Sequence, residues 1–237
     1  MNIYQDILCA KKEGRKLLAL LIDPDKLTND SLAALVKKIN TLPVTHIFVG
    51  GSLVENNVLD HLLTSLKEVT SLPVILFPGD PSQLSDKADG LLFLQLLSGR
   101  NPTYLIDYQL AAVPVLKDAQ VEIISTAYLL IDGGKESAVQ RVSQTQPMSR
   151  TDVSKVVDTC IAGMWMGSKL IYLEAGSGAL FSVPKEMITE VHKAVDIPVI
   201  VGGGIRSAQM IEEVYQAGAD LVVIGTAFEN DTNFFNS

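Results

Sequence analysis

Residues 198–226 read PVIVGGGIRSAQMIEEVYQAGADLVVIGT, and this stretch decides the expected fold. Two continuous apolar runs, 198–202 and 220–225, flank a segment, 207–217, whose apolar residues recur every three or four positions. The pattern is typical of two buried parallel strands joined by an amphipathic helix. Gly218 stands where such a helix ends. The stretch therefore predicts a β–α–β unit with a glycine-rich turn after each strand.

The same unit recurs along the whole chain. Apolar runs of strand length occupy residues 17–23, 45–50, 73–77, 90–96, 121–130, 169–174, 198–202 and 220–225. Helical spacing occupies residues 31–40, 54–69, 102–112, 151–166, 184–195 and 207–217. Eight alternating units predict a (β/α)₈ TIM barrel, formed by residues 1–237 as one domain. A doubly wound open sheet is the alternative, but eight strands exceed most such sheets.

Two connections depart from the repeating unit. Residues 78–89, PGDPSQLSDKAD, are too few and too rich in proline for a crossover helix with its loops. We therefore expect the third helix to be missing or reduced, which would leave an apolar trough on the barrel flank. Residues 131–150, IDGGKESAVQRVSQTQPMSR, are polar and show no convincing helical period. So long a connection predicts a functional lid or a disordered segment.

Composition limits the class of protein. The 237 residues include 27 acidic and 19 basic side chains, a formal charge of −8, and 47% are hydrophobic. That apolar fraction excludes a disordered chain, and the acidic balance argues against a nucleic-acid partner. No apolar run reaches the roughly 18 residues of a transmembrane segment. Two cysteines and an amino-terminal sequence unlike a signal peptide lead us to expect a cytoplasmic protein.

Glycine-rich segments follow the last three predicted strands. They are EAGSGA at 174–179, GGGIR at 202–206, and Gly225 with Thr226. In barrels the active site lies at the carboxyl ends of the strands, and the late loops often hold phosphate. Glycine lets backbone N–H groups approach an anion closely, and helix N-termini favour negative charge. Tight turns without a ligand are the alternative, but three adjacent loops favour a phosphate site.

Three polar residues end predicted strands at the same face. Asp23 closes the first strand, where a carboxylate fits Mg²⁺, and Ser52 after the second strand would be a second oxygen ligand. The alternatives are a loop cap for Asp23 and a helix N-cap for Ser52. Glu174 ends the sixth strand beside the expected phosphate. A carboxylate next to a phosphate is electrostatically unfavourable, so its presence suggests a function such as general base. A turn cap is its alternative. Tyr172 shares the direction of Glu174 because side chains alternate along a strand.

The motifs LIDPDK, GGS, FPG, SGRNP, YLEAGSGA, VGGGIR and GTAFE occur in this order along nearly the whole chain. Together they resemble the geranylgeranylglyceryl phosphate synthase family, which includes bacterial heptaprenylglyceryl phosphate synthases. VGGGIR is common among phosphate-binding barrels, whereas LIDPDK combined with YLEAGSGA is specific. Leu21 stands where the heptaprenyl group has lysine, so the sequence is most similar to the archaeal-like, geranylgeranyl group.

The resemblance implies a TIM barrel lacking a regular third helix. Its activity would join sn-glycerol 1-phosphate to a polyprenyl diphosphate through an ether bond and release pyrophosphate. By the same resemblance, Asp23 and Ser52 would hold Mg²⁺, and Glu174 and Tyr172 would be catalytic. The residues expected to bind glycerol phosphate are Tyr172, Leu173, Glu174, Ala175, Gly176, Ser177, Gly178, Gly203, Gly204, Gly225 and Thr226.

The resemblance also implies a homo-oligomer, a dimer or a hexamer, with no nucleic-acid partner and with transient membrane contact for product release. Two other functions remain open from the residues themselves. The first is a phosphosugar isomerase, epimerase or aldolase-like enzyme on the same barrel. No lysine closes a predicted strand, which weakens a Schiff-base aldolase. The second is a non-catalytic protein that binds a lipid phosphate.

Overall fold

The computed structural model describes residues 2–24, 39, 42–51 and 56–225, and within them eight parallel strands close into a barrel in sequential order. Strand β1 pairs with both β2 and β8, which closes the ring. This confirms the predicted TIM barrel. The strands are β1 (Leu17–Ile22), β2 (His46–Val49), β3 (Val74–Leu76), β4 (Gly90–Leu96), β5 (Glu122–Leu130), β6 (Leu170–Glu174), β7 (Val199–Gly202) and β8 (Leu221–Ile224).

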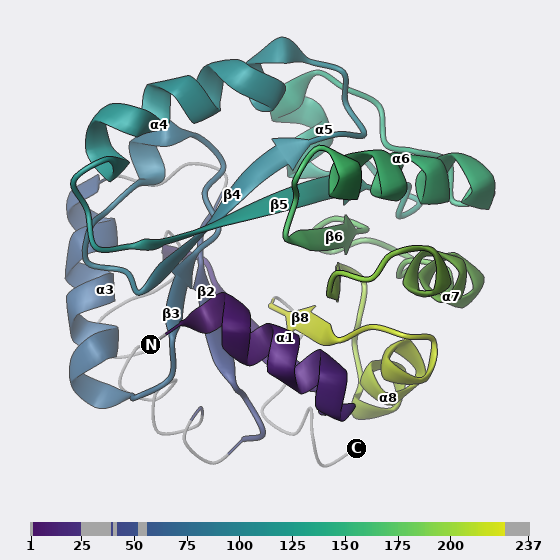
Figure 1. Cartoon of the computed structure of the whole chain (residues 1–237), viewed down its shortest axis with the longest axis horizontal. Helices are drawn as coiled ribbons and strands as arrows, with labels where there is room; N and C mark the ends of the chain where they lie inside the picture. The colour runs from purple at the N-terminus through teal and green to yellow at the C-terminus, as the bar shows by residue number, and fades with distance from the viewer. Residues whose placement is uncertain (1, 25–38, 40–41, 52–55, 226–237) are drawn as a thin grey trace.

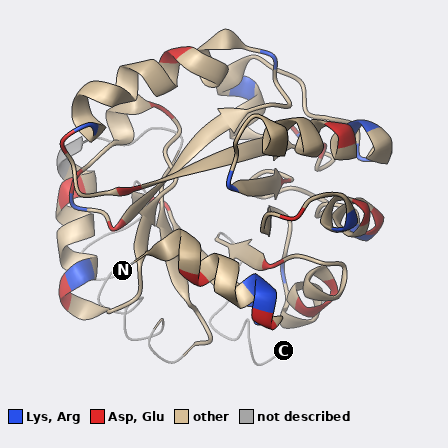
Figure 2. Cartoon of the chain, in the orientation of Figure 1, with Lys and Arg blue, Asp and Glu red and all other residues tan. Residues whose placement is uncertain are grey.

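Helices surround the strands (Figure 1). Most lie where the sequence predicts them, whereas the helix expected at 31–40 falls almost wholly outside the described residues. Charged side chains gather on these outer helices and loops, and the strands carry few (Figure 2). The helices are α3 (Asn56–Val69), α4 (Tyr108–Leu116) with a preceding π-helical turn η3 (Thr103–Asp107), α6 (Val153–Trp165), α7 (Lys185–Ala194) and α8 (Ala208–Gln216).

Helix α1 (Ile3–Glu13), which the sequence analysis did not predict, lies across one opening of the barrel (Figure 1). Its buried residues Ile3, Ile7 and Ala10 pack in one cluster with the barrel interior, at helical spacing that was readable in the sequence. The helix closes the end at which the strands begin. The opposite end of the barrel, where the strands finish, is therefore the end that can bind a ligand.

The third helix is reduced to a short 3₁₀ turn, as predicted. Between β3 and β4 the chain forms only η2 (Pro81–Gln83), whose first turn is capped by Asp80 Oδ1 accepting a hydrogen bond from Ser82 N at 2.7 Å. Outward-facing side chains of β4, such as Leu91 and Phe93, therefore have no long crossover helix from this connection packed over them.

Residues 131–150 are ordered, which contradicts the disordered alternative, and several of them line the cavity described below, so the lid stays a prediction. They contain helix α5 (Ala138–Ser143), with Ser137 Oγ accepting a hydrogen bond from Gln140 N at 3.1 Å. Ile131 also forms an isolated parallel bridge with Met148. The prediction of no helix was wrong because a six-residue helix is too short to show a clear period. Ser137, an N-cap residue type, was the available signal.

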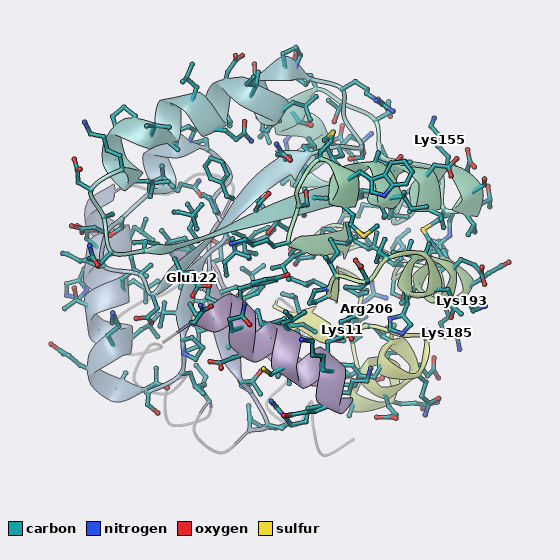
Figure 3. All side chains as sticks on the ribbon, viewed as in Figure 1. Lys11, Glu122, Lys155, Lys185, Lys193 and Arg206 are labelled. Atoms are coloured by element: carbon teal, nitrogen blue, oxygen red, sulfur yellow. The ribbon has the colours of Figure 1, made fainter. Side chains whose placement is uncertain are left out.

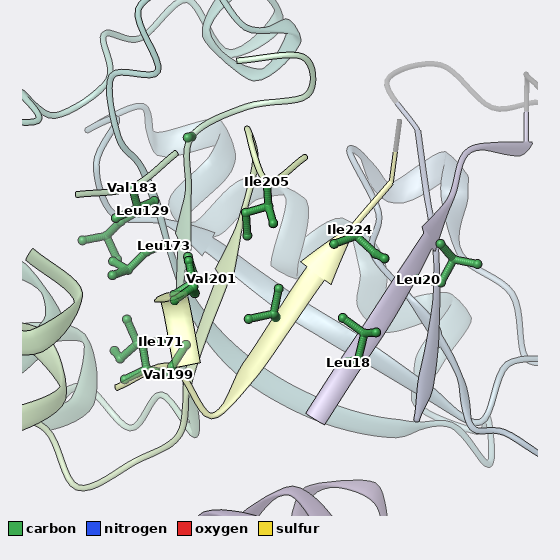
Figure 4. Packing of buried hydrophobic residues seen from close by; sticks show 14 of the residues in the cluster. Leu18, Leu20, Leu129, Ile171, Leu173, Val183, Val199, Val201, Ile205 and Ile224 are labelled. Atoms are coloured by element: carbon green, nitrogen blue, oxygen red, sulfur yellow. The ribbon is translucent and has the colours of Figure 1, made fainter. Parts of the chain in front are cut away.

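Alternation along β6 decides which side chains reach the barrel interior. Leu170 and Tyr172 belong to the inner core, whereas Ile171 and Leu173 face the surrounding helices. Figure 4 shows side chains of this outer layer: Ile171 and Leu173 lie near Val199 and Val201 of β7, whereas Ile224 of β8 and the β1 residues Leu18 and Leu20 lie further round the barrel. Glu174 follows the inward direction of Tyr172. In the described part of the chain, no helix has both the length and the apolarity needed to cross a membrane.

Candidate active site

A cavity of about 1180 Å³ opens at the end of the barrel where the strands finish. Predicted site residues from four different strand ends line it together, although they are up to 202 positions apart in the sequence (225 − 23). The closed barrel brings these loops to one face. The predicted residues that line the cavity are Asp23, Glu174, Gly176, Ser177, Gly178, Gly203, Gly204 and Gly225.

Five other predicted residues do not line the cavity or cannot be placed. Tyr172 is fully buried in the interior beneath Glu174, and the Leu173 side chain packs outward. Ala175 is buried in the outer layer as well. The remaining two, Ser52 and Thr226, lie outside the described residues.

Glu174 is a buried carboxylate at the base of the glycine loops. Its Oε1 accepts a hydrogen bond from Gly176 N at 2.7 Å. Burial raises the pKa of Glu174 to about 7, while the Gly176 N–H and the nearby Tyr172 hydroxyl lower it by less. The Tyr172 hydroxyl lies close to the carboxylate but forms no hydrogen bond of good geometry with any described residue. A carboxyl with a pKa near neutrality is suited to accept a proton at physiological pH.

The loops after β6 and β7 pack so closely that they require glycine. A Cβ atom on Gly202 would lie 2.5 Å from Glu174 Oε2. One on Gly204, where φ is +70°, would lie 2.9 Å from the backbone of Phe181 and Ser182. The N–H groups of Gly203 and Gly204 make no hydrogen bond within the described part of the chain. They remain available to an anion.

Two aromatic side chains that line the cavity stand beside Glu174. The rings of Phe77 and Tyr128 lie 5.8 Å apart, and each has its centroid 5.3 Å from that of Tyr172. Burial, and next the negative charge of Glu174, hold the pKa of Tyr128 well above its usual value, so the phenol stays neutral. Tyr128 is a cavity residue that was not predicted from the sequence. Its signal was its inward register on β5, opposite Tyr172 of β6.

Away from the glycine loops, the cavity wall becomes apolar. This part, called the groove below, extends along the flank where the third helix is missing, between η2 and α4. The trough predicted from residues 78–89 is therefore present. Its apolar lining comes from Leu84, Leu91, Leu92, Phe93, Leu94, Leu96, Tyr104, Tyr108 and Ala112.

Asp23 directly follows β1 and lines the cavity near Gly50 and Gly51. A carboxylate and backbone oxygens are ligands that suit Mg²⁺, which commonly takes one or two carboxylates and completes its shell with substrate phosphates and water. No group of three or more His, Cys, Asp or Glu side chains is arranged to hold a metal among the residues that the structure describes. The donor set therefore fits a magnesium ion bound together with a phosphorylated substrate.

A closed parallel barrel with glycine-rich loops after its last three strands belongs to the class of phosphate-binding (β/α)₈ barrels. The long groove beside the glycine loops marks a subset that accommodates an apolar ligand as well. Within this class, the chain belongs to the PcrB family, which it matches over residues 11–236.

Relatives from bacteria and archaea agree with this family. Geranylgeranylglyceryl phosphate synthase of Flavobacterium johnsoniae is 58% identical over 236 residues, covering 100% of this chain and 97% of the relative. The enzyme of the same name from Pyrococcus furiosus is 38% identical over 221 residues, covering 93% and 87%. The crystal structure of (S)-3-O-geranylgeranylglyceryl phosphate synthase from Thermoplasma acidophilum in complex with sn-glycerol-1-phosphate superposes with a TM-score of 0.92, at 34% identity over 100% of this chain and 95% of that one. The family resemblance seen in the sequence is confirmed.

Proposed function

We propose that this protein is a prenyltransferase that forms an ether bond between sn-glycerol 1-phosphate and a polyprenyl diphosphate, geranylgeranyl diphosphate in the first instance, and releases pyrophosphate. The observation that carries the proposal is the continuity of one cavity between the glycine loops and the apolar groove. A sugar phosphate would need the first part but not the second. The names of the relatives support the same substrates.

In this proposal the glycine loops hold glycerol phosphate. The N–H groups of Gly203 and Gly204 bind its phosphate together with Gly176–Gly178 and Gly225, and Thr226 belongs to the same site. Leu173 and Ala175 contribute through their backbone, since their side chains face outward. Fixing the glycerol hydroxyl beside the allylic carbon removes much of the entropic barrier to the reaction.

Glu174 accepts the proton of the glycerol hydroxyl. The hydroxyl oxygen forms a bond to the terminal allylic carbon, and the bond from that carbon to the diphosphate breaks, so its electron pair leaves with pyrophosphate. Tyr172, packed beneath the carboxylate, positions it. The faces of Phe77 and Tyr128 line the region where positive charge develops on the allyl group, and aromatic faces attract cations.

Asp23 and Ser52 are the proposed protein ligands of Mg²⁺. When bound, the ion neutralises the charge that accumulates on the departing diphosphate. Asp23 lines the cavity near Phe77 and the start of the groove, where a diphosphate joined to an apolar tail would lie. With Asp23 as a protein carboxylate ligand, the ion would keep coordination positions for the diphosphate oxygens.

The proposal also covers the domain organisation, the oligomeric state and the cellular location of the enzyme. Residues 1–237 form one catalytic domain that works in the cytoplasm as a homo-oligomer, a dimer or a hexamer. Because the product carries a long apolar chain, its release requires transient contact with a membrane. Light scattering of the purified protein, and sedimentation with and without lipid vesicles, test these two points.

The decisive experiment is product analysis. The protein is mixed with sn-glycerol 1-phosphate, Mg²⁺ and prenyl diphosphates of several lengths, and the products are identified by mass. We expect an ether-linked prenylglycerol phosphate and pyrophosphate. Turnover of a sugar phosphate instead would favour an isomerase, epimerase or aldolase. Binding of the prenyl lipid without any product would favour a lipid-phosphate binding protein.

A further inference from the structure

Residues 132–137 form a second layer behind the glycine loop of β6. Gly133 O accepts hydrogen bonds from Leu180 N at 2.9 Å and from Phe181 N at 3.1 Å. Arg150 joins the same two segments, because its Nη1 donates to Asp132 O at 3.1 Å and its guanidinium lies 4.8 Å from the Phe181 ring centroid. The connection is thereby held against the loop that follows β6.

The contact between the two layers is close at the glycines themselves. A Cβ atom on Gly176 would lie 2.8 Å from the Cβ of Ser137, which caps helix α5. A Cβ atom on Gly178 would meet only one group within 4 Å, the Nζ of Lys135 at 3.4 Å. The ammonium group of Lys135 is thus placed directly over the glycine loop, and its side chain lines the cavity.

Among the residues that the structure describes, two other basic side chains line the cavity, Arg141 and Arg206. Arg206 donates hydrogen bonds to the carbonyl oxygens of Ala179 and Leu180 and so supports the loop. The Arg141 side chain has no hydrogen bond or ion pair with the described residues, but it lies beside Val142, whose carbonyl oxygen accepts a hydrogen bond from the groove residue Tyr104. Lys135 makes neither a hydrogen bond nor an ion pair with any residue that the structure describes.

An anion bound in the glycine loops would lie beside an acid, Glu174, in a protein whose net charge is −8. Backbone N–H groups alone carry only partial charges, whereas a lysine ammonium is a full point charge that binds phosphate well. We infer that Lys135 is a substrate-binding residue that pairs with the phosphate of glycerol phosphate and offsets its repulsion by Glu174. This inference rests on the proposed function.

The test compares Lys135→Gln with Lys155→Gln. Both changes remove one positive charge, but Lys155 lies on α6 at the periphery (Figure 3). We expect Lys135→Gln to raise the KM for glycerol 1-phosphate by about tenfold or more, as loss of a charged hydrogen bond does. The KM for prenyl diphosphate should change by less than about twofold, and Lys135→Arg should restore most of the affinity. Added salt should weaken glycerol phosphate binding less in Lys135→Gln than in the wild type.

Two results would overturn the inference. One is a KM for glycerol 1-phosphate in Lys135→Gln that matches that of Lys155→Gln. The other is an increase confined to the KM for prenyl diphosphate, which would assign Lys135 to the other substrate. Calorimetric titration with glycerol 1-phosphate alone keeps the test independent of turnover. If the wild type binds glycerol phosphate through Lys135 but forms no ether product, the proposed function fails and this inference stands.

Discussion

The two ends of the cavity are built in opposite ways on the same barrel. Around the glycine loops, β6, β7 and β8 lie beside regular helices, and the loops touch backbone to backbone, as at Gly204 against Phe181. Along the groove, the connection after β3 is reduced to η2 and outward side chains of β4 are left to line a channel. In the first region, close packing of the loops orients backbone N–H groups toward the cavity. In the second, the absence of a full helix after β3 leaves space for the groove. One fold can therefore hold a phosphate and an apolar chain side by side.

The largest expected effect concerns the place where the two regions meet. Replacing Asp23 with Asn should reduce turnover by roughly 10³-fold or more, because loss of metal-assisted charge neutralisation costs several kcal/mol. Asp80→Asn, another cavity carboxylate, is the control and should retain most activity. Steady-state rates over a Mg²⁺ titration measure both. Normal Mg²⁺ dependence in Asp23→Asn would remove Asp23 from the metal site.

The next effect belongs to the glycine-loop side. Glu174→Gln should lower kcat by about 10²–10³-fold, since general-base catalysis contributes on this order. The base must be ionised, so the wild-type kcat should rise with pH through about 7, which is the pKa of Glu174. The pH profile of kcat tests this. A profile without an inflection near that pH would assign proton transfer to another group.

The same substitution should stabilise the fold at high pH. The pKa of Glu174 is raised from 4.5 to about 7 on folding, so the stability due to its protonated form is complete below 4.5 and is lost as pH rises through 7. Above pH 7 the loss amounts to roughly 3 kcal/mol, which Glu174→Gln should recover. Urea unfolding at pH 5 and pH 8 measures it, with the exposed Glu136→Gln as control. Equal unfolding free energies for wild type and Glu174→Gln at pH 8 would contradict it.

A smaller effect on turnover is expected at Phe77, one of the two aromatic residues that line the cavity between the glycine loops and the groove. Phe77→Leu keeps an apolar side chain but removes the ring face, so kcat should fall by roughly twentyfold while the KM for prenyl diphosphate changes little. Phe77→Tyr should behave like the wild type. Steady-state kinetics separate kcat from KM. A change in KM alone would make Phe77 part of the groove wall and nothing more.

The smallest effect concerns the groove. Phe93 lines it from the outer face of β4, so Phe93→Ala should lengthen or widen the channel. We expect the ratio of kcat/KM values for a longer over a shorter prenyl diphosphate to rise by about fivefold, with the KM for glycerol 1-phosphate unchanged. Leu110→Ala, on the exposed side of α4, is the control. An unchanged length preference would place the limit of the groove elsewhere.

Prediction from sequence succeeded for the repeated β/α elements and failed for two helices outside that repeat, α1 and α5. The strands and the helices α6, α7 and α8 showed long apolar periods, so they were predicted within a few residues. Helix α1 was missed although Ile3, Ile7 and Ala10 share one face, and α5 was missed because six residues give no period. Tyr128 and Lys135 were missed as site residues because each looks ordinary within its own segment.

The sequence by itself determined the barrel, the reduced third helix and the strand-end positions of Asp23 and Glu174, because alternation and spacing are local properties of the chain. Only the tertiary structure decided that Tyr172 lies beneath Glu174 while Leu173 turns away, and that burial moves the pKa of Glu174 to about 7. It alone placed Lys135 over Gly178, 43 positions further along the chain (178 − 135). Desolvation and contacts between distant loops depend on how the barrel closes, and no single segment of the sequence records them.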